Sequence, residues 1–163
     1  MSTVGVIMGS DSDYIIMDEG VKVLQQFEVS YKIKLTSTDN NILERTVEWL
    51  EEFENFGGKV IIAGNAKDLH FAGKIAGLTT VPVIAVPIRH NGSEDIDSLF
   101  NIVQQGSPVA AVGINGARNA ALLAVAVLGI NDEGLRVALK DFRHKMTSEV
   151  MEKDKILQEK SIK

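Results

Sequence analysis

The chain has 163 residues, of which 45% are hydrophobic and 24% are charged, and its formal net charge at pH 7 is −5. This length and composition suit a single domain spanning residues 1–163, and an acidic balance without a basic stripe disfavours a nucleic-acid partner. The sequence has no cysteine, no secretory leader and no apolar run as long as a membrane span, so we expect a cytoplasmic protein without disulfides or a membrane partner.

Strand-like and helix-like stretches alternate along residues 3–128, which is typical of a parallel sheet with helices on both faces. Strands are predicted at residues 3–8, 31–35, 60–63, 81–86 and 109–114, and helices after them at about 14–27, 42–56, 68–78, 94–105 and 120–128. The second strand alternates apolar residues with lysines, which predicts a place near the sheet edge, whereas the apolar third and fourth strands are predicted at its centre. Gly57 and Gly58 predict the end of the second helix.

The pattern changes after Gly129, where residues 132–157 contain no predicted strand. Apolar side chains recur there at three- and four-residue steps and predict one long amphipathic helix. The stripe consists of Leu135, Leu139, Phe142, Met146 and Val150. The five-stranded unit, residues 1–129, is complete without this helix, so we expect the stripe to pack on another subunit. Packing on its own domain is the alternative.

The loop after the first predicted strand is polar and reads Gly-Ser-Asp-Ser-Asp at residues 9–13. Ligands of open parallel sheets bind at the carboxyl ends of the strands, where loops present backbone N–H groups and small polar side chains. Ser10, Ser12 and Asp13 are therefore candidate ligand-binding residues, although Asp13 is also placed to be only the N-cap of the following helix. Apart from Asp39, no third carboxylate falls at a strand end, so we expect no metal site.

Several blocks of the sequence, in order from residue 3 to about 150, resemble the PurE family, the 5-(carboxyamino)imidazole ribonucleotide mutases of purine synthesis. The blocks are residues 4–13, residues 60–64 with His70 six positions on, residues 81–87, residues 97–99 with 102–104, and residues 119–124. Separate blocks at near-family spacing are far more specific than any single glycine motif.

The resemblance implies a flavodoxin-like α/β fold, a three-layer α/β/α sandwich around a five-stranded parallel sheet, with a C-terminal oligomerisation helix at about 132–157. It implies a homo-octamer with active sites where subunits meet, and neither a metal nor an organic cofactor. The implied reaction moves a carboxylate from the exocyclic nitrogen to ring carbon four of an imidazole ribonucleotide, through release and recapture of carbon dioxide. Ser10 and Asp13, with Ser12 adjacent, match the family's substrate-binding residues of the first loop, and Ser37 matches the serine of the second.

The second loop departs from the family pattern, which has Ser-Ala-His-Arg-Thr-Pro where residues 37–42 read Ser-Thr-Asp-Asn-Asn-Ile. Asp39 stands in place of the family's acid/base histidine, and Asn40 in place of its phosphate-binding arginine. A histidine ordinarily has a pKa of about 6.5 and an aspartate one of about 3.9. Asp39 therefore needs a strongly raised pKa, for example through burial, to transfer a proton near neutral pH.

The third loop departs as well, because the family has a glycine- and alanine-rich run where residues 65–69 read Asn-Ala-Lys-Asp-Leu, which reduces backbone clearance against a ligand. His70 keeps its place and is a second candidate for proton transfer, the alternative being a helix-start histidine satisfied by backbone groups. Arg89 or Lys67 would replace the lost phosphate contact, and the alternative for Arg89 is a solvated loop charge.

Two functions of different class follow. In the first, the chain is a mutase or related carboxylating enzyme of de novo purine biosynthesis, in which Asp39 or His70 moves the proton. In the second, it is a PurE paralogue that binds a related ribonucleotide but has lost or changed the reaction. Loss of the family histidine and arginine favours the second, whereas Ser10, Asp13, Ser37 and His70 favour a ribonucleotide ligand in either case. A nucleotide-binding or response-regulator-like module on the same fold is a third reading.

Overall fold

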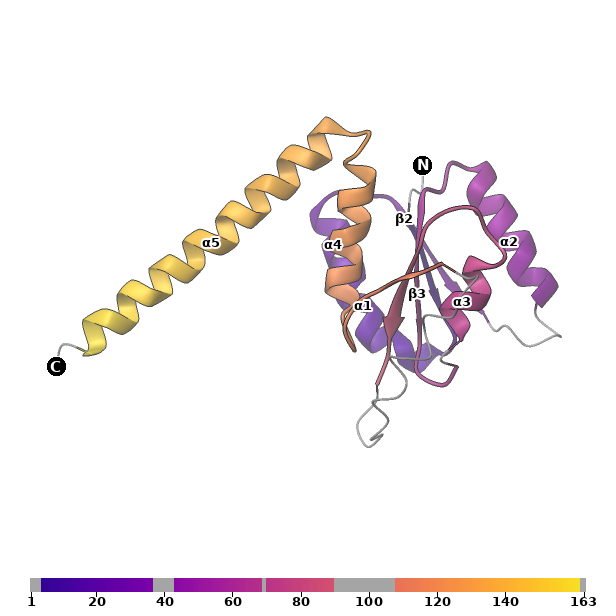
Figure 1. Cartoon of the computed structure of the whole chain (residues 1–163), viewed down its shortest axis with the longest axis horizontal. Coiled ribbons are helices and arrows are strands. Elements are labelled where there is room, and N and C mark those ends of the chain that lie inside the picture. The colour runs from indigo at the N-terminus through magenta and orange to yellow at the C-terminus, as the bar shows by residue number, and fades with distance from the viewer. Residues whose placement is uncertain (1–3, 37–42, 69, 90–107, 162–163) are drawn as a thin grey trace.

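The computed structural model describes residues 4–36, 43–68, 70–89 and 108–161 (Figure 1). Five parallel strands form one sheet in the order β2-β1-β3-β4-β5. Their bounds are Val4–Met8 for β1, Tyr31–Leu35 for β2, Val60–Asn65 for β3, Val83–Pro87 for β4 and Ala110–Ala111 for β5. The predicted parallel sheet is confirmed, with the uniformly apolar β3 and β4 inside it.

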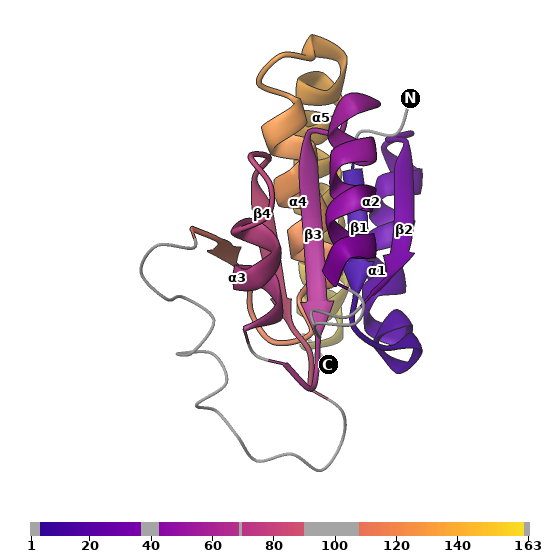
Figure 2. The same cartoon turned by 90° about the vertical axis from the view of Figure 1, so that its right-hand side faces the viewer.

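Helices cover both faces of the sheet. The helices α1 (Tyr14–Gln26) and α4 (Ala117–Leu128) lie on one face, and α2 (Leu43–Asn55) and α3 (Phe71–Ala76) lie on the other (Figure 2). Successive side chains of a strand point to opposite faces of the sheet: Val6 packs with α1 and α4, and Ile7 packs with α2 and α3. This arrangement confirms the flavodoxin-like α/β/α sandwich.

The second strand lies at the sheet edge, as its alternating sequence predicted. Strand β2 pairs with β1 alone, and its apolar side chains are not fully covered by the helices. Ile33 is 44% exposed and Leu35 is 54% exposed. Lys32, on the opposite face, places its ammonium 4.9 Å from the ring centre of Phe56 at the end of α2.

Helix α2 ends at the predicted pair of glycines. Gly57 has a φ of 84°, a left-handed conformation that glycine adopts without strain. The N–H of Gly57 bonds to the carbonyl of Glu54 at 2.9 Å, and the N–H of Gly58 bonds to that of Phe53 at 2.9 Å. These two bonds satisfy carbonyls at the helix end and confirm the predicted C-cap.

Three predicted boundaries differ from those observed. Helix α3 begins at Phe71 instead of residue 68, because the Asp68 carboxylate accepts the His70 N–H at 2.9 Å and holds a turn there. Strand β5 has two residues instead of the six predicted at 109–114, although the Val112 N–H still bonds to the Ala85 carbonyl at 3.1 Å. Helix α4 begins three residues early, at Ala117. The helix predicted at 94–105 lies outside the described residues.

The long C-terminal helix is confirmed as α5 (Glu133–Ser161), but its apolar stripe divides into two parts. Leu139 is only 9% exposed, and Leu135 and Phe142 pack against the core cluster to which α1 and α4 contribute. The rings of Phe142 and Phe27 lie 5.5 Å apart. For these three side chains the alternative, packing on the chain's own core, is observed.

The second part of α5 extends away from the sheet and its helices (Figure 1). Met146 is 48% exposed and Val150 is 66% exposed, and Met151, Ile156 and Leu157 are exposed as well. Although α5 has 29 residues, it is too polar to cross a bilayer, and no helix in the described part of the chain is both long enough and apolar enough to do so. The apolar residues beyond Phe142 therefore remain uncovered by the part of the chain that the structure describes.

Glu54 joins the end of α2 to the segment before β4. Its carboxylate accepts the Thr79 hydroxyl at 2.5 Å, the Thr80 hydroxyl at 2.9 Å and the Thr80 N–H at 3.3 Å. The hydrogen bond from Thr79 is the main cause that lowers the pKa of Glu54, with those from Thr80 adding to it. This ionised carboxylate fixes one end of the layer formed by α2 and α3.

Candidate functional site

The candidate site is built on the carboxyl ends of neighbouring strands. Met8 of β1 lies in register with Leu35 of β2 and Gly64 of β3, so the loops after all three strands start at one edge of the sheet. The N–H of Thr36 bonds to the Met8 carbonyl at 3.0 Å, and the N–H of Gly9 bonds to the Gly64 carbonyl at 3.3 Å. Backbone bonds therefore extend the sheet to where the loops begin.

The first loop presents two hydroxyl groups above a buried carboxylate. Ser10 and Ser12 share a hydrogen bond of 2.9 Å between their hydroxyl oxygens, and Ser10 Oγ also accepts the Ser12 N–H at 3.4 Å as the cap of a short 3₁₀ turn (Asp11–Asp13). Asp13 is fully buried, at 0% exposure. Asp13 stands at the N-cap position of α1, but its side chain makes no capping hydrogen bond to the helix, so the alternative of a purely capping carboxylate is not supported.

The third loop is closed by two side chains that bond to its backbone. Asn65 Oδ1 accepts the N–H of Lys67 at 2.8 Å and that of Asp68 at 3.3 Å. Asp68 Oδ1 accepts the N–H of His70 at 2.9 Å, and its Oδ2 lies 2.9 Å from the Lys74 ammonium. These side-chain bonds fix the conformation of the loop at positions where the family pattern has glycine and alanine.

His70 lies just before α3, at the start of a helix as expected. Its side chain makes no capping hydrogen bond and is exposed to solvent. The alternative of a histidine satisfied by backbone groups of the helix start is therefore not supported. An exposed imidazole at the carboxyl edge of the sheet is accessible to a ligand bound there. Proton transfer by His70 stays a prediction.

Arg89, after β4, is tied to the loop before α4. Its N–H donates to Asn115 Oδ1 at 2.8 Å, and its carbonyl accepts Asn115 Nδ2 at 3.1 Å. Asn115 has a φ of 56°, which asparagine tolerates better than most residues. The loops after β4 and before α4 therefore meet at the same sheet edge, and the Arg89 side chain is partly buried there.

Three of the predicted site residues, Ser37, Asp39 and Asn40, lie outside the described residues, so their roles stay predictions. The described chain stops at Thr36, whose hydroxyl shares a buried hydrogen bond of 2.5 Å with that of Thr46 in α2. In the part of the chain that the structure does describe, no three His, Asp or Glu side chains are grouped to hold a metal ion.

Sequence reasoning missed two residues of this edge, Asn65 and Asn115. An asparagine next to a predicted strand end, or before a glycine as in Asn115-Gly116, is a signal for a side chain that bonds to nearby backbone. Which backbone groups it meets depends on how separate loops come together. The sequence pattern alone does not supply that information.

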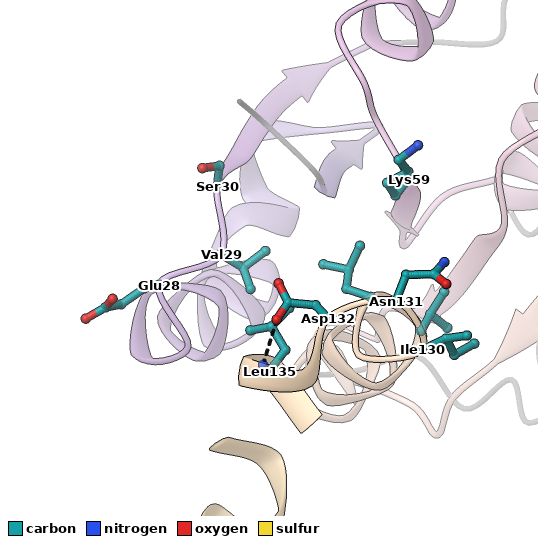
Figure 3. A pocket seen from close by; sticks show the side chains of 10 residues that line it. Glu28, Val29, Ser30, Lys59, Ile130, Asn131, Asp132 and Leu135 are labelled. Atoms are coloured by element: carbon teal, nitrogen blue, oxygen red, sulfur yellow. Dashed lines mark hydrogen bonds between the residues drawn. The ribbon is translucent and has the colours of Figure 1, made fainter. Parts of the chain in front are cut away.

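A cavity of about 520 Å³ lies at the opposite edge of the sheet (Figure 3). It is formed where Val29 and Ser30 precede β2, Lys59 precedes β3, and Asp132 caps α5 through the Leu135 N–H at 3.1 Å. Open parallel sheets bind ligands beyond the carboxyl ends of their strands, and this cavity is at the amino ends. We therefore place the candidate site at the loops of Ser10, Asn65, His70 and Arg89.

Comparison with known proteins identifies the family and agrees with the fold. The family model "AIR carboxylase" matches residues 3–149. The N5-carboxyaminoimidazole ribonucleotide mutase of Pyrococcus abyssi is 47% identical over 90% of this chain and 84% of its own length. The protein of the same name from Thermotoga maritima is 39% identical over 98% of this chain and 94% of its own.

Two further matches extend this comparison. The phosphoribosylaminoimidazole carboxylase of Candida glabrata is 41% identical over 92% of this chain, which corresponds to 26% of that longer protein. The crystal structure of Treponema denticola PurE superposes with a TM-score of 0.84 at 24% identity and covers 94% of this chain and 97% of the other. The structural match, at this identity, supports the fold alone.

Proposed function

The chain belongs to the AIR carboxylase family, and from that premise we propose that it is a cytoplasmic mutase of purine biosynthesis acting on carboxyaminoimidazole ribonucleotide. The observation that carries this proposal is the 39–47% identity to relatives named as that mutase, over 90–98% of the chain. In the proposed reaction a carboxylate passes from the exocyclic nitrogen to ring carbon four of the same molecule. No other reactant is consumed.

This reaction requires the protein to bind the ribonucleotide and to transfer protons. The bond from nitrogen to the carboxylate breaks and releases carbon dioxide while the nitrogen gains a proton; ring carbon four then bonds to the carbon dioxide and loses its proton. The Ser10 and Ser12 hydroxyls, as donors and acceptors, suit the ribose or phosphate. His70 and Asp39 are the proposed proton carriers, because one group must give a proton and later take one back.

A second candidate is a paralogue that binds a related ribonucleotide with a lost or changed reaction. The observation that favours it is the presence of Asp39 and Asn40 where the family pattern has histidine and arginine. An aspartate is ordinarily ionised near neutral pH, and asparagine lacks the charge that holds a phosphate. Both candidates share the ribonucleotide site and differ in turnover.

We predict that Ser10→Ala weakens binding of aminoimidazole ribonucleotide by at least about tenfold, since a hydrogen bond to a charged group is worth about 1.5–3 kcal/mol. Isothermal titration calorimetry measures the affinity. Ser30→Ala, which removes an exposed hydroxyl at the opposite edge of the sheet, is the matched control and should bind like the unmodified protein. If the unmodified protein binds no such ribonucleotide, both candidate functions fail.

We also propose a homo-oligomer, most simply the octamer that the resemblance implies, with the outer part of α5 between subunits. Truncation after Lys145 keeps the packing of Leu139 and Phe142 but removes Val150 and the other exposed apolar residues beyond it. Because an uncovered apolar stripe is costly in water, the truncated chain should form smaller assemblies than the intact one. Size-exclusion chromatography with light scattering gives the masses. A monomeric intact chain at micromolar concentration would contradict this assignment.

A further inference from the structure

Asn65 is the last residue of β3, and its side-chain amide has a defined orientation. Two of the hydrogen bonds that close the third loop, from the N–H groups of Lys67 and Asp68, are accepted by its oxygen, Oδ1. The oxygen therefore faces the third loop. The nitrogen, Nδ2, points to the other side, toward the end of β1.

At the end of β1, the space that Nδ2 occupies exists because residue 9 is glycine. A Cβ atom built on Gly9 would overlap Asn65 Nδ2 and would lie 2.6 Å from Asn65 Cγ. The Asn65 amide thus lies directly over the backbone of Gly9, beside the loop that presents the Ser10 hydroxyl. Gly9 is itself held to β3 by its N–H bond to the Gly64 carbonyl at 3.3 Å.

The chemistry of this position is that of a donor. An asparagine Nδ2 carries two N–H groups, and within the described ranges neither donates a hydrogen bond to a protein acceptor. The side chain is half-buried, at the sheet edge where ligands of this fold class bind. Lys67 is two residues away, is exposed, and adds a positive charge to the same loop.

From this placement we propose that Asn65 Nδ2 donates a hydrogen bond to an anionic oxygen of the substrate, while Asn65 Oδ1 holds the loop that leads to His70. The proposal rests on the proposed ribonucleotide function. The family pattern is rich in glycine and alanine at this loop, so Asn65 supplies a side-chain donor that the pattern lacks. The anionic oxygen belongs either to the carboxylate or to the phosphate of the ribonucleotide, which offer the same chemistry to an amide donor.

The decisive variant is Asn65→Asp, which keeps an oxygen for the two loop N–H groups and replaces the donor with a second, negatively charged oxygen. Asn131→Asp is the matched control, because it adds the same charge beside the cavity at the opposite edge of the sheet. Asn65→Gly removes the donor without adding charge, together with the Oδ1 acceptor of the loop, and serves if the aspartate variant does not fold. Thermal unfolding checks that each variant is intact.

Calorimetry with three ligands separates the possible oxygens: carboxylated aminoimidazole ribonucleotide, aminoimidazole ribonucleotide without the carboxylate, and the aminoimidazole riboside without either group. We expect Asn65→Asp to weaken binding of the carboxylated ribonucleotide at least tenfold and Asn131→Asp to leave its affinity unchanged. A loss confined to the carboxylated ligand identifies the carboxylate; an equal loss for both ribonucleotides, absent for the riboside, identifies the phosphate.

Two results would overturn the proposal while leaving the proposed function in place. In one, both Asn65 variants bind the carboxylated ribonucleotide within twofold of the unmodified protein. In the other, both variants weaken binding of all three ligands equally. The riboside has no anionic oxygen, so its loss would show that Asn65 does not act through such an oxygen. If the unmodified protein binds none of the ligands, the proposed function fails, and this proposal fails with it.

Discussion

Replacing Asp39 with histidine and Asn40 with arginine together should raise turnover of carboxyaminoimidazole ribonucleotide by about 10²–10⁴-fold, the usual contribution of a positioned general acid or base. A histidine exchanges protons near neutral pH, which an aspartate does only with a strongly raised pKa. The arginine adds a charge-assisted contact to the phosphate, worth about 1.5–3 kcal/mol of binding. Steady-state kinetics on the unmodified and double-variant proteins measures the change.

The control for this pair adds the same charges elsewhere. Asp141→His with Asn131→Arg changes exposed residues of α5 and of the loop before it, and should leave turnover as it is. If the unmodified chain already turns over as fast as relatives with histidine and arginine in this motif, the reasoning about Asp39 is wrong and another proton carrier is at work. A double variant that binds ribonucleotide but gains no activity favours the paralogue with a changed reaction.

Gly20→Ala should lower the free energy of unfolding by about 1–3 kcal/mol, as overpacking of a tight interface usually does. Gly20 lies in α1 where that helix crosses α4, and an added Cβ would lie 2.7 Å from the backbone carbonyl oxygen of Ala117. A backbone oxygen at a helix start cannot rotate away as a flexible side chain can. Urea unfolding measures the free energy, against a gain in helix propensity of about 1 kcal/mol that acts in the other direction.

Gly77→Ala is the matched control, since a Cβ there makes only ordinary contacts, 3.5 Å from the Lys74 carbonyl oxygen and 3.7 Å from that of Gly73. We expect its free energy of unfolding to stay within about 0.5 kcal/mol of the unmodified protein. If Gly20→Ala is as stable as this control, α1 and α4 do not approach each other as closely as described.

The fold is predictable from the sequence where burial is uniform. Central strands such as β3 are apolar at nearly every position, and the lysines of β2 mark it as an edge, so periodicity alone places both. The α5 stripe shows where periodicity stops being sufficient. Leu139 and Val150 belong to the same apolar stripe of α5. Leu139 packs against the core and Val150 is exposed, because α5 extends beyond the sheet and its helices between these two residues.

The site is predictable only in part, for a different reason. Ser10, Ser12 and His70 are found from strand ends and family likeness, and the described structure places them on loops at one sheet edge. The hydrogen bonds of Asn65 and Asn115 run between side chains and loop backbone, and no periodic pattern encodes them. Asp13 is at the N-cap position of α1, as its place in the sequence predicts, but its side chain makes no capping hydrogen bond.

The most direct test of the proposed function follows a ¹³C-labelled carboxylate by NMR. Carboxyaminoimidazole ribonucleotide that carries the label on its exocyclic nitrogen is mixed with the unmodified protein, and the signal of the carboxylate on ring carbon four is recorded over time. We predict that this signal grows faster than in protein-free solution, slowly with Asp39 in place and much faster in the Asp39→His, Asn40→Arg protein. Transfer at the protein-free rate in both proteins, while calorimetry shows the ribonucleotide bound, would contradict the mutase function.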